Sequence, residues 1–183
     1  MRIISGKFKS RKIKFPIKSE SRPTKDRIRE SVFNIIADKL DDADVLDIFA
    51  GSGAYGFEAL SRGAKKVVFV EKDRETGYIL SENSRSLGVG ESIKIIKIDA
   101  FKAIELLASS TEKFDIIFSD PPYDRDMAKK TLIMVNRYDI LEHSGLLVVE
   151  HSKREALPKV EGDVSIFKQK TYGNIFISVF LRK

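Results

Sequence analysis

The four residues at 120–123, Asp-Pro-Pro-Tyr, have the clearest chemistry in this sequence, and they follow an apolar run. Consecutive prolines lack N–H donors and stiffen the backbone, so Pro121 can hold its carbonyl at a fixed angle beside the Asp120 carboxylate. Tyr123, which follows Pro122, adds an aromatic face. Two acceptors and a stacking surface suit an exocyclic amine on a planar ring. The simpler alternative is a proline-rich turn in which Asp120 caps a helix.

A second candidate site is the glycine-rich run GSGAYG at residues 51–56, which follows the apolar run VLDIF. Its glycines match the dinucleotide pattern G-x-G-x-x-G, which alone is weak evidence. Gly51 and Gly53 permit a tight turn and a close approach to a ligand, whereas Gly56 is expected to pack inside the next helix. Asp47 lies within the apolar run, which is unusual for a buried position unless a partner is near.

Acidic residues end two further apolar runs. Glu71 lies about twenty residues beyond Gly51, where an acid can accept from both hydroxyls of a ribose. Asp99 ends the third run. Each acid alone could be a helix cap, but together with the glycine turn they indicate an adenosine-bearing ligand. A dinucleotide and S-adenosylmethionine both fit these residues, and the proline pair favours S-adenosylmethionine because a dehydrogenase leaves it without a role.

The elements that must position these residues alternate regularly from residue 44 onward. Apolar strands separated by helices predict an α/β fold with a doubly wound, mostly parallel sheet covered on both faces. The expected strands are 45–49, 66–71, 92–98, 114–119 and 146–150, and the expected helices are 54–61, 73–87, 101–108 and 126–136. Gly173 and Asn174, between two strand-like runs, predict a closing antiparallel hairpin. Ligands bind such sheets at the carboxyl ends of the strands, where the acids and glycines lie.

The N-terminal segment is strongly basic. Residues 1–30 contain eleven Lys or Arg and three acidic residues, and the whole chain has a net charge of +6. The run RIISGKFKSRKIKFP predicts two short basic strands, and an N-cap at Thr24 predicts a helix to about residue 40. We therefore divide the chain into a basic hairpin extension at 1–22 and a main domain at 23–183. The extension is either a solvated surface or a contact for a polyanion.

Composition excludes several classes of protein. The chain has no cysteine and two histidines, His143 and His151, so disulfides, thiolate sites, histidine metal clusters and a Ser-His-Asp triad are not expected. No apolar run reaches the roughly 18 residues of a membrane span, and the N-terminus lacks the apolar region of a secretory signal. We expect a cytoplasmic protein without a metal site.

These motifs together resemble a known family. The runs RIISGKFKSRKIKFP, RPTKDRIRESVFNII, DIFAGSGAYGFEALSRGA and DPPY are similar to the RsmD-type 16S rRNA (guanine-N2)-methyltransferases, over nearly the whole chain. Tyr55 between the glycines, in place of leucine, and Tyr123, in place of the phenylalanine of some members, depart from the pattern without changing the chemistry. The resemblance implies a class I, Rossmann-like methyltransferase with a seven-stranded sheet and S-adenosylmethionine as its cofactor.

The resemblance also implies roles for individual residues. The catalytic residues would be Asp120, Pro121, Pro122 and Tyr123. The cofactor would contact Asp47, Gly51 and Gly53 around its methionine end, Glu71 at the ribose, and Asp99 with Ala100 at the adenine. Phe49 and Ala50 would also belong to the cofactor site. The RNA would contact Arg2, Lys7, Lys9, Arg11, Lys12, Arg22, Thr24 and Arg27. Arg22, Thr24 and Arg27 belong to an RPT-x-x-R element, for which the alternative is a capped helix with solvent-facing arginines.

The expected partner is 16S rRNA, within a small ribosomal subunit or an assembly intermediate, and the expected state is a monomer. An adenine-N6 DNA methyltransferase uses the same tetrapeptide, but this chain has no room for a large target-recognition domain. Methylation of a protein glutamine would leave the basic segment without a function. A cofactor-binding RNA chaperone without turnover would not need an intact DPPY.

Overall fold

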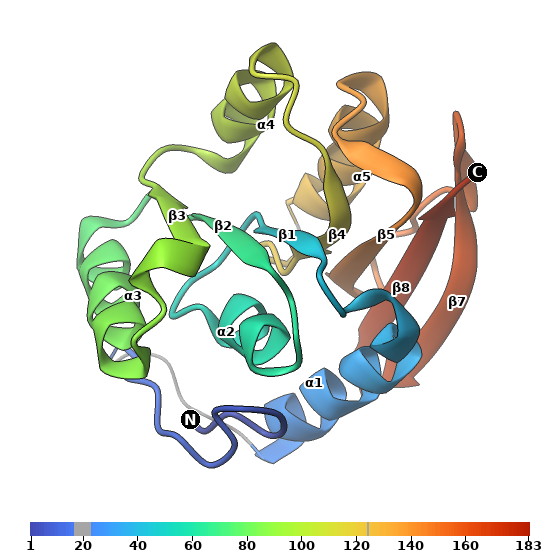
Figure 1. Cartoon of the computed structure of the whole chain (residues 1–183). Coiled ribbons are helices and arrows are strands. Elements are labelled where there is room, and N and C mark those ends of the chain that lie inside the picture. The colour runs from blue at the N-terminus through green and yellow to red at the C-terminus, as the bar shows by residue number, and fades with distance from the viewer. Residues whose placement is uncertain (17–22, 124) are drawn as a thin grey trace.

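The computed structural model describes residues 1–16, 23–123 and 125–183, and their core is one mixed sheet with helices on both faces (Figure 1). Its strands are β1 (Asp44–Asp47), β2 (Lys66–Val70), β3 (Ile93–Ile96), β4 (Phe114–Ser119), β5 (Leu141–Ser152), β6 (Val160–Glu161), β7 (Val164–Tyr172) and β8 (Ile175–Arg182). Its α-helices are α1 (Pro23–Ile35), α2 (Ala54–Ser61), α3 (Arg74–Leu87), α4 (Ala100–Ser109) and α5 (Met127–Arg137), and 3-10 turns cover Ala37–Lys39 and Gly90–Ser92.

The strand order across the sheet is β3-β2-β1-β4-β5-β8-β7-β6. The first five of these strands are parallel, and β8, β7 and β6 continue the sheet in antiparallel pairs. The chain moves outward from β1 to β3 and then crosses back to β4, so the order reverses between β1 and β4. A doubly wound sheet binds ligands at this reversal.

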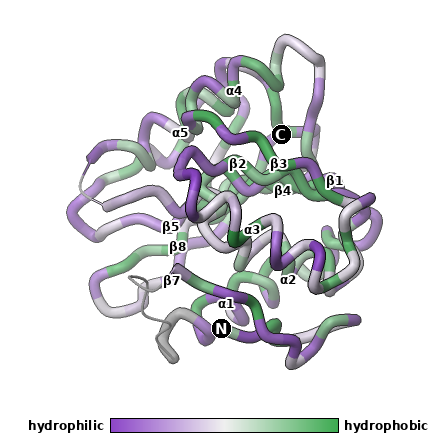
Figure 2. The backbone as a smooth tube through the Cα atoms, turned by 90° about the vertical axis from the view of Figure 1, so that its left-hand side faces the viewer, coloured by the Kyte–Doolittle hydropathy of each residue, from purple (hydrophilic) through white to green (hydrophobic). Residues whose placement is uncertain are grey.

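The parallel strands are apolar because they are buried on both faces. Neighbouring residues of β1 point into different cores, with Val45 packing towards α1, α2 and α3 and Leu46 packing towards α4 and α5. Figure 2 shows the hydrophobic strands between helices whose outer faces are more polar. Among the residues that the structure describes, no helix is both long enough and apolar enough to cross a membrane.

The predicted α/β fold and the C-terminal hairpin are confirmed, with Gly173 in a left-handed conformation between β7 and β8. The sheet differs from the sequence prediction in the number and the bounds of its strands. The sheet gains an eighth strand, the two-residue β6, which is too short to leave an apolar pattern. The strand predicted at 146–150 begins at Leu141, where a change of register near Phe114 accommodates the polar residues before Gly145.

The N-terminal segment, residues 1–16, contains one antiparallel bridge, between Arg2 and Lys12, in place of the two predicted strands. We call this segment the arm. It keeps a hairpin course because Ile3 and Ile13 are buried in the core. The predicted extension also included residues 17–22, which lie outside the described residues. The helix that follows begins at Pro23, so Thr24 lies in its first turn rather than before it, and it ends at Ile35.

Candidate active site

Two hollows meet at the carboxyl edge of the sheet, with volumes of about 360 Å³ and about 280 Å³. The first is lined by Ile48, Phe49, Val70, Glu71, Lys72, Ile98, Asp99, Ala100, Asp120, Pro121, Pro122, Tyr123 and Met127. The second is lined by Met1, Phe15, Pro16, Arg29, Phe49, Ala50, Gly51, Ser52, Ala54, Tyr55, Glu71, Thr76, Asp120 and Glu150. Phe49, Glu71 and Asp120 line both hollows, so the two form one continuous site at the reversal of strand order.

The turn at residues 51–56, which we call the glycine turn, is held in place by the Glu71 carboxylate. Glu71 accepts hydrogen bonds from the backbone N–H of Gly51 at 2.9 Å and of Asp73 at 2.8 Å. Gly51 has a φ of +54°, and a Cβ there would meet no described atom within 4 Å. The missing side chain of Gly51 therefore leaves open space at the second hollow.

The other two glycines of the turn are packed. Gly53 begins α2 with a φ of +84°, and a Cβ there would lie 2.5 Å from the ring of Phe57. A Cβ on Gly56 would lie 2.1 Å from the ring of Phe69. Gly56 therefore packs as the sequence predicts, whereas Gly53 shapes the turn without lining either hollow.

Asp47 lies beneath the glycine turn rather than in the hollows. Its side chain is buried and accepts the Gly56 N–H at 3.1 Å. Burial raises the pKa of Asp47 to about 7; the bond from Gly56 opposes this and the charge of Glu71 adds to it. Asp47 is absent from both linings, so its observed partner is the backbone of α2.

The far end of the first hollow is formed by the start of α4. Asp99 caps this helix by accepting the Phe101 N–H at 3.0 Å, and Ala100 is buried at the lining. Phe49 meets the Phe101 ring edge-on, with ring centroids 6.2 Å apart. The hollow thus combines an apolar wall with carboxylates at the ends of β2 and β3, an arrangement that suits an adenosine.

Residues 120–123, the acceptor segment, directly follow β4 and line the first hollow. Pro121 is buried, whereas the Tyr123 side chain is 38% exposed. The Tyr123 hydroxyl donates to Glu150 on β5. Burial raises the pKa of Tyr123 above its usual range, and the charges of Asp120 and Glu150 add to this effect. Tyr123 therefore offers a neutral ring held at one end.

Glu150 is a site residue that the sequence reasoning missed. It is 5% exposed and also accepts the Tyr55 hydroxyl at 3.3 Å. The Tyr55 ring stacks on Phe118 with centroids 5.1 Å apart, and burial followed by the charge of Glu150 raises the pKa of Tyr55. An acid at the end of the predicted strand LLVVE carries the signal that identified Glu71 and Asp99, so the same reasoning could have found it.

The arm is attached to the body by buried charges. Glu58 of α2 is fully buried and accepts the backbone N–H groups of Ile4 at 2.7 Å and Ser5 at 3.0 Å, and the Arg62 Nε at 2.7 Å. Arg29 of α1, also buried, donates to the Arg2 carbonyl at 2.8 Å. The arm is therefore a fixed wall of the second hollow, to which Met1, Phe15 and Pro16 contribute.

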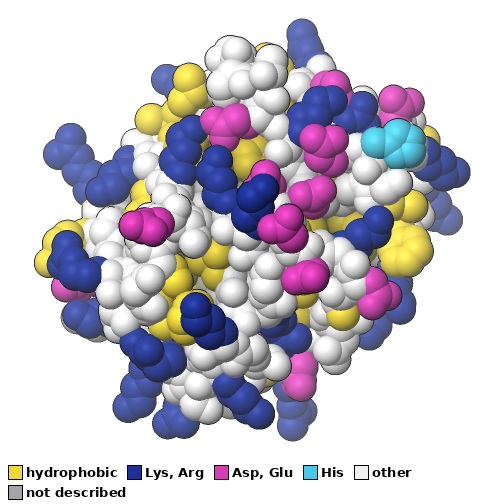
Figure 3. All heavy atoms as spheres, in the orientation of Figure 1, with side chains coloured by type: hydrophobic (Ala, Val, Ile, Leu, Met, Phe, Trp, Pro, Cys, Tyr) yellow, Lys and Arg dark blue, Asp and Glu magenta, His cyan; other side chains and the backbone are white. Residues whose placement is uncertain are grey.

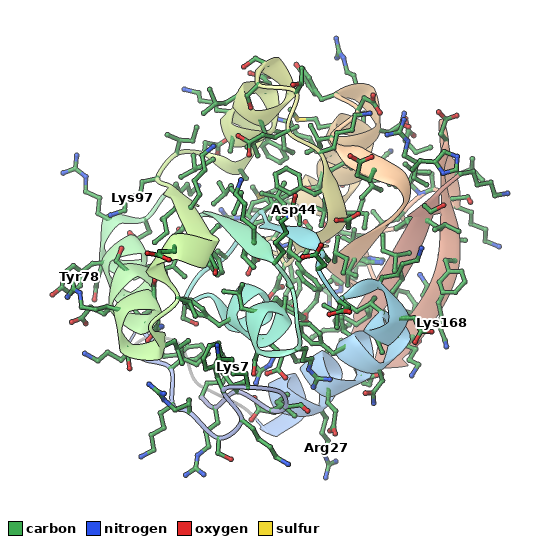
Figure 4. All side chains as sticks on the ribbon, viewed as in Figure 1. Lys7, Arg27, Asp44, Tyr78, Lys97 and Lys168 are labelled. Atoms are coloured by element: carbon green, nitrogen blue, oxygen red, sulfur yellow. The ribbon has the colours of Figure 1, made fainter. Side chains whose placement is uncertain are left out.

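The described cations among those predicted to contact RNA lie on the arm and on α1. Lysine and arginine side chains gather at the lower edge in Figure 3, and Figure 4 labels Arg27 at this edge and Lys7 above it. The exposed members of the predicted set are Arg2, Lys7, Lys9, Arg11, Lys12 and Arg27. Arg22 and the side chain of Thr24 lie outside what the structure describes. Within the described ranges, no group of three or more His, Cys, Asp or Glu side chains could hold a metal ion.

Comparisons with known proteins find relatives that match the whole chain. The model of the family described as Conserved hypothetical protein 95 matches residues 1–181. YlbH of Bacillus subtilis is 35% identical over all of both chains. The Ribosomal RNA small subunit methyltransferase D of Escherichia coli is 34% identical over all of this chain and 90% of its own length. A solved Escherichia coli structure superposes with a TM-score of 0.88, with 32% identity over all of this chain and 98% of that one.

Proposed function

We propose that this chain, which belongs to the Conserved hypothetical protein 95 or RsmD family of methyltransferases, methylates the exocyclic N2 amine of a guanine in small-subunit ribosomal RNA. It would act as a monomer on a small ribosomal subunit or an assembly intermediate in the cytoplasm. The observation that carries the proposal is the acceptor segment, because Asp120 lines both hollows and Pro121, the next residue, lines the first.

The first hollow fits the adenosine of S-adenosylmethionine, which supplies an electrophilic methyl group on its sulfonium when bound. Each Glu71 oxygen already accepts one backbone N–H, and an ionised carboxylate has further lone pairs for the two ribose hydroxyls. Asp99 and Ala100 would border the adenine, and Phe49 would supply an apolar contact. Gly51 leaves the space that the rest of the cofactor requires, because a side chain there would enter the second hollow.

Asp120 and Pro121 would act on the substrate amine. The N2 lone pair of guanine is delocalised into the ring, so the amine is a poor nucleophile. Hydrogen bonds from N2–H to the Asp120 carboxylate and the Pro121 carbonyl favour the pyramidal nitrogen that develops positive charge in the transition state. Most of the remaining rate enhancement comes from alignment of the reacting atoms, which the stiff proline pair supports.

Tyr123 would stack on the target base. An enzyme that modifies a base edge takes the base out of its stack and packs it against an aromatic or apolar side chain. The neutral Tyr123 ring is held through its hydroxyl by Glu150, which lines the second hollow, so it would provide such a surface where the two hollows meet.

The arm would contact the RNA backbone. Exposed Lys and Arg side chains on a fixed segment neutralise phosphates and set the orientation of the RNA without reading its bases. The anchoring of Ile4 and Ser5 by Glu58 supports this role, because a fixed arm places its charges at a constant distance from Asp120.

The test is methyl transfer from labelled S-adenosylmethionine to three acceptors offered separately: small-subunit particles, naked ribosomal RNA and DNA. We expect label in the ribosomal RNA, recovered after digestion as N2-methylguanosine by mass spectrometry. Label in DNA as N6-methyladenine would support the alternative of a DNA methyltransferase. Label in none of the three would refute the proposal.

A further inference from the structure

Two carboxylates lie side by side at the carboxyl edge of the sheet. Strands β4 and β5 pair in parallel with Ser119 opposite Val149, so the next residues along, Asp120 and Glu150, are neighbours across the two strands. Both line the second hollow. The proposed chemistry uses Asp120 and gives Glu150 no contact with the substrate, although Glu150 is a buried acid at the same site.

Glu150 is held in one orientation by two tyrosines. Tyr123 donates to its Oε1 and Tyr55 donates to its Oε2. The stacking of Tyr55 on Phe118 fixes the second donor in turn. A carboxylate has about four lone-pair directions, so each oxygen keeps one for a ligand in the hollow. Glu150 is therefore a positioned acceptor rather than only a support for Tyr123.

The bases differ in what they present next to the reacting amine. Guanine carries the N1–H donor beside its N2 amine. Adenine and cytosine carry an unprotonated ring nitrogen, an acceptor, beside their exocyclic amine. Two adjacent carboxylates match two adjacent donors, whereas a carboxylate facing an acceptor leaves both groups unpaired and repelling each other. Sites built to hydrogen-bond a substrate group reject analogues that lack it.

We propose that Glu150 accepts the N1–H of the target guanine while Asp120 accepts an N2–H, so that Glu150 selects guanine over adenine and cytosine. This assignment rests on the proposed function, because it requires an RNA base in the second hollow. The arm supports it: Phe15 and Pro16 border the same hollow, and the same segment carries exposed lysines and arginines that can contact RNA phosphates.

The experiment compares guanine with 2-aminopurine, which keeps the 2-amine but has a lone pair in place of N1–H. The modified guanine is first mapped with the wild-type protein, and a synthetic segment carrying either base at that position is ligated into the ribosomal RNA. The wild-type protein should prefer guanine by about 100-fold in kcat/KM, the size expected for one hydrogen bond to a charged acceptor. Glu150→Gln should reduce the preference to a few-fold, because its amide N–H can donate to the 2-aminopurine nitrogen.

Matched variants separate recognition from folding. Glu142→Gln makes the same change at the exposed beginning of the same strand and should keep the wild-type preference. Tyr55→Phe keeps the ring but removes one of the two donors that orient Glu150, and should lower the preference several-fold. Tyr55→Phe therefore decides the question if Glu150→Gln does not fold.

The outcomes are distinct. Failure of the wild-type protein to methylate any ribosomal RNA would refute the proposed function itself. Methylation by the wild-type protein together with an unchanged preference in Glu150→Gln, or in Tyr55→Phe if only that variant folds, would overturn the role of Glu150 alone. A tenfold loss of affinity for S-adenosylhomocysteine in Glu150→Gln, with the guanine preference intact, would also overturn it by assigning Glu150 to the cofactor.

Discussion

The glycine turn and the acceptor segment lie on the same edge of the sheet, but they use their residues differently. In the glycine turn, side chains serve the backbone: Glu71 and Asp47 accept the N–H groups of Gly51 and Gly56. In the acceptor segment, the polar groups of Asp120 line the hollows. The glycine turn thus sets the shape of the site and the acceptor segment supplies its chemistry. Substitutions in the glycine turn should therefore lower stability or cofactor affinity, whereas substitutions in the acceptor segment should lower turnover.

The largest expected effect belongs to the acceptor segment. Asp120→Ala removes the carboxylate proposed to stabilise the developing charge on N2, so turnover should fall by about 1000-fold or more. Affinity for S-adenosylhomocysteine should stay within about threefold, because Glu71 and Asp99 keep the other end of the cofactor site. Single-turnover methylation and titration calorimetry give the two values.

The matched control for this change is Asp38→Ala, which removes an exposed acid from a 3-10 turn and should leave both values unchanged. Wild-type turnover in Asp120→Ala would eliminate Asp120 from the chemistry. An equal loss of turnover and affinity would place Asp120 with the shape-setting residues.

A second test compares two glycines of the glycine turn, one expected to affect mainly stability and the other mainly cofactor affinity. Gly56→Ala forces a Cβ against the Phe69 ring and should lower the free energy of unfolding by about 2 to 3 kcal/mol, with little change in cofactor affinity for the folded fraction. Gly51→Ala should cost about 1 kcal/mol, because its methyl group meets open space and only the left-handed backbone is strained. The Gly51 variant should instead weaken S-adenosylhomocysteine binding by about tenfold, through the methyl group in the hollow.

Urea unfolding gives the free energy of unfolding of both variants, and titration calorimetry gives their affinity for S-adenosylhomocysteine. Similar stability losses with similar affinities would show that the glycine turn does not divide into a packed part and a ligand-facing part.

The sequence predicted the framework of the site because its signals are local. The helix expected at 54–61 and the strand expected at 114–119 match α2 and β4 residue for residue. Apolar runs, a glycine turn and acids at strand ends are all visible within a few positions. The sequence therefore predicts the edge of the sheet at which Asp120, Glu71 and Asp99 lie.

What the sequence could not supply depends on residues far apart in the chain. Glu58 lies on an ordinary helical segment, and nothing near it indicates that it is buried against the N–H groups of Ile4 and Ser5, more than fifty positions away. The two glycines Gly51 and Gly53 look equivalent in the motif, and the packing of Phe57 and Leu80 against Gly53 distinguishes them. Long-range packing decided each of these cases.

The smallest effect tests the shape-setting role of Asp47. Because burial raises its pKa from 3.8 to about 7, the native state keeps a proton that the unfolded chain has already released near neutrality. The stability linked to Asp47 therefore falls as the pH rises towards 7 and levels off above it. Asp47→Asn does not titrate, and its amide oxygen can still accept the Gly56 N–H. Between pH 6 and 8 its free energy of unfolding should rise by about 1 kcal/mol relative to the wild-type protein.

Urea unfolding of both proteins across this range measures the difference, in which the other titrating groups cancel. Parallel curves would show that Asp47 is already ionised in the native state. Because the Asp47 side chain lines neither hollow, affinity for S-adenosylhomocysteine should be the same in both proteins. A clear loss in the variant would instead place Asp47 at the methionine end of the cofactor, as the family resemblance implies, and would remove it from the residues that only support the turn.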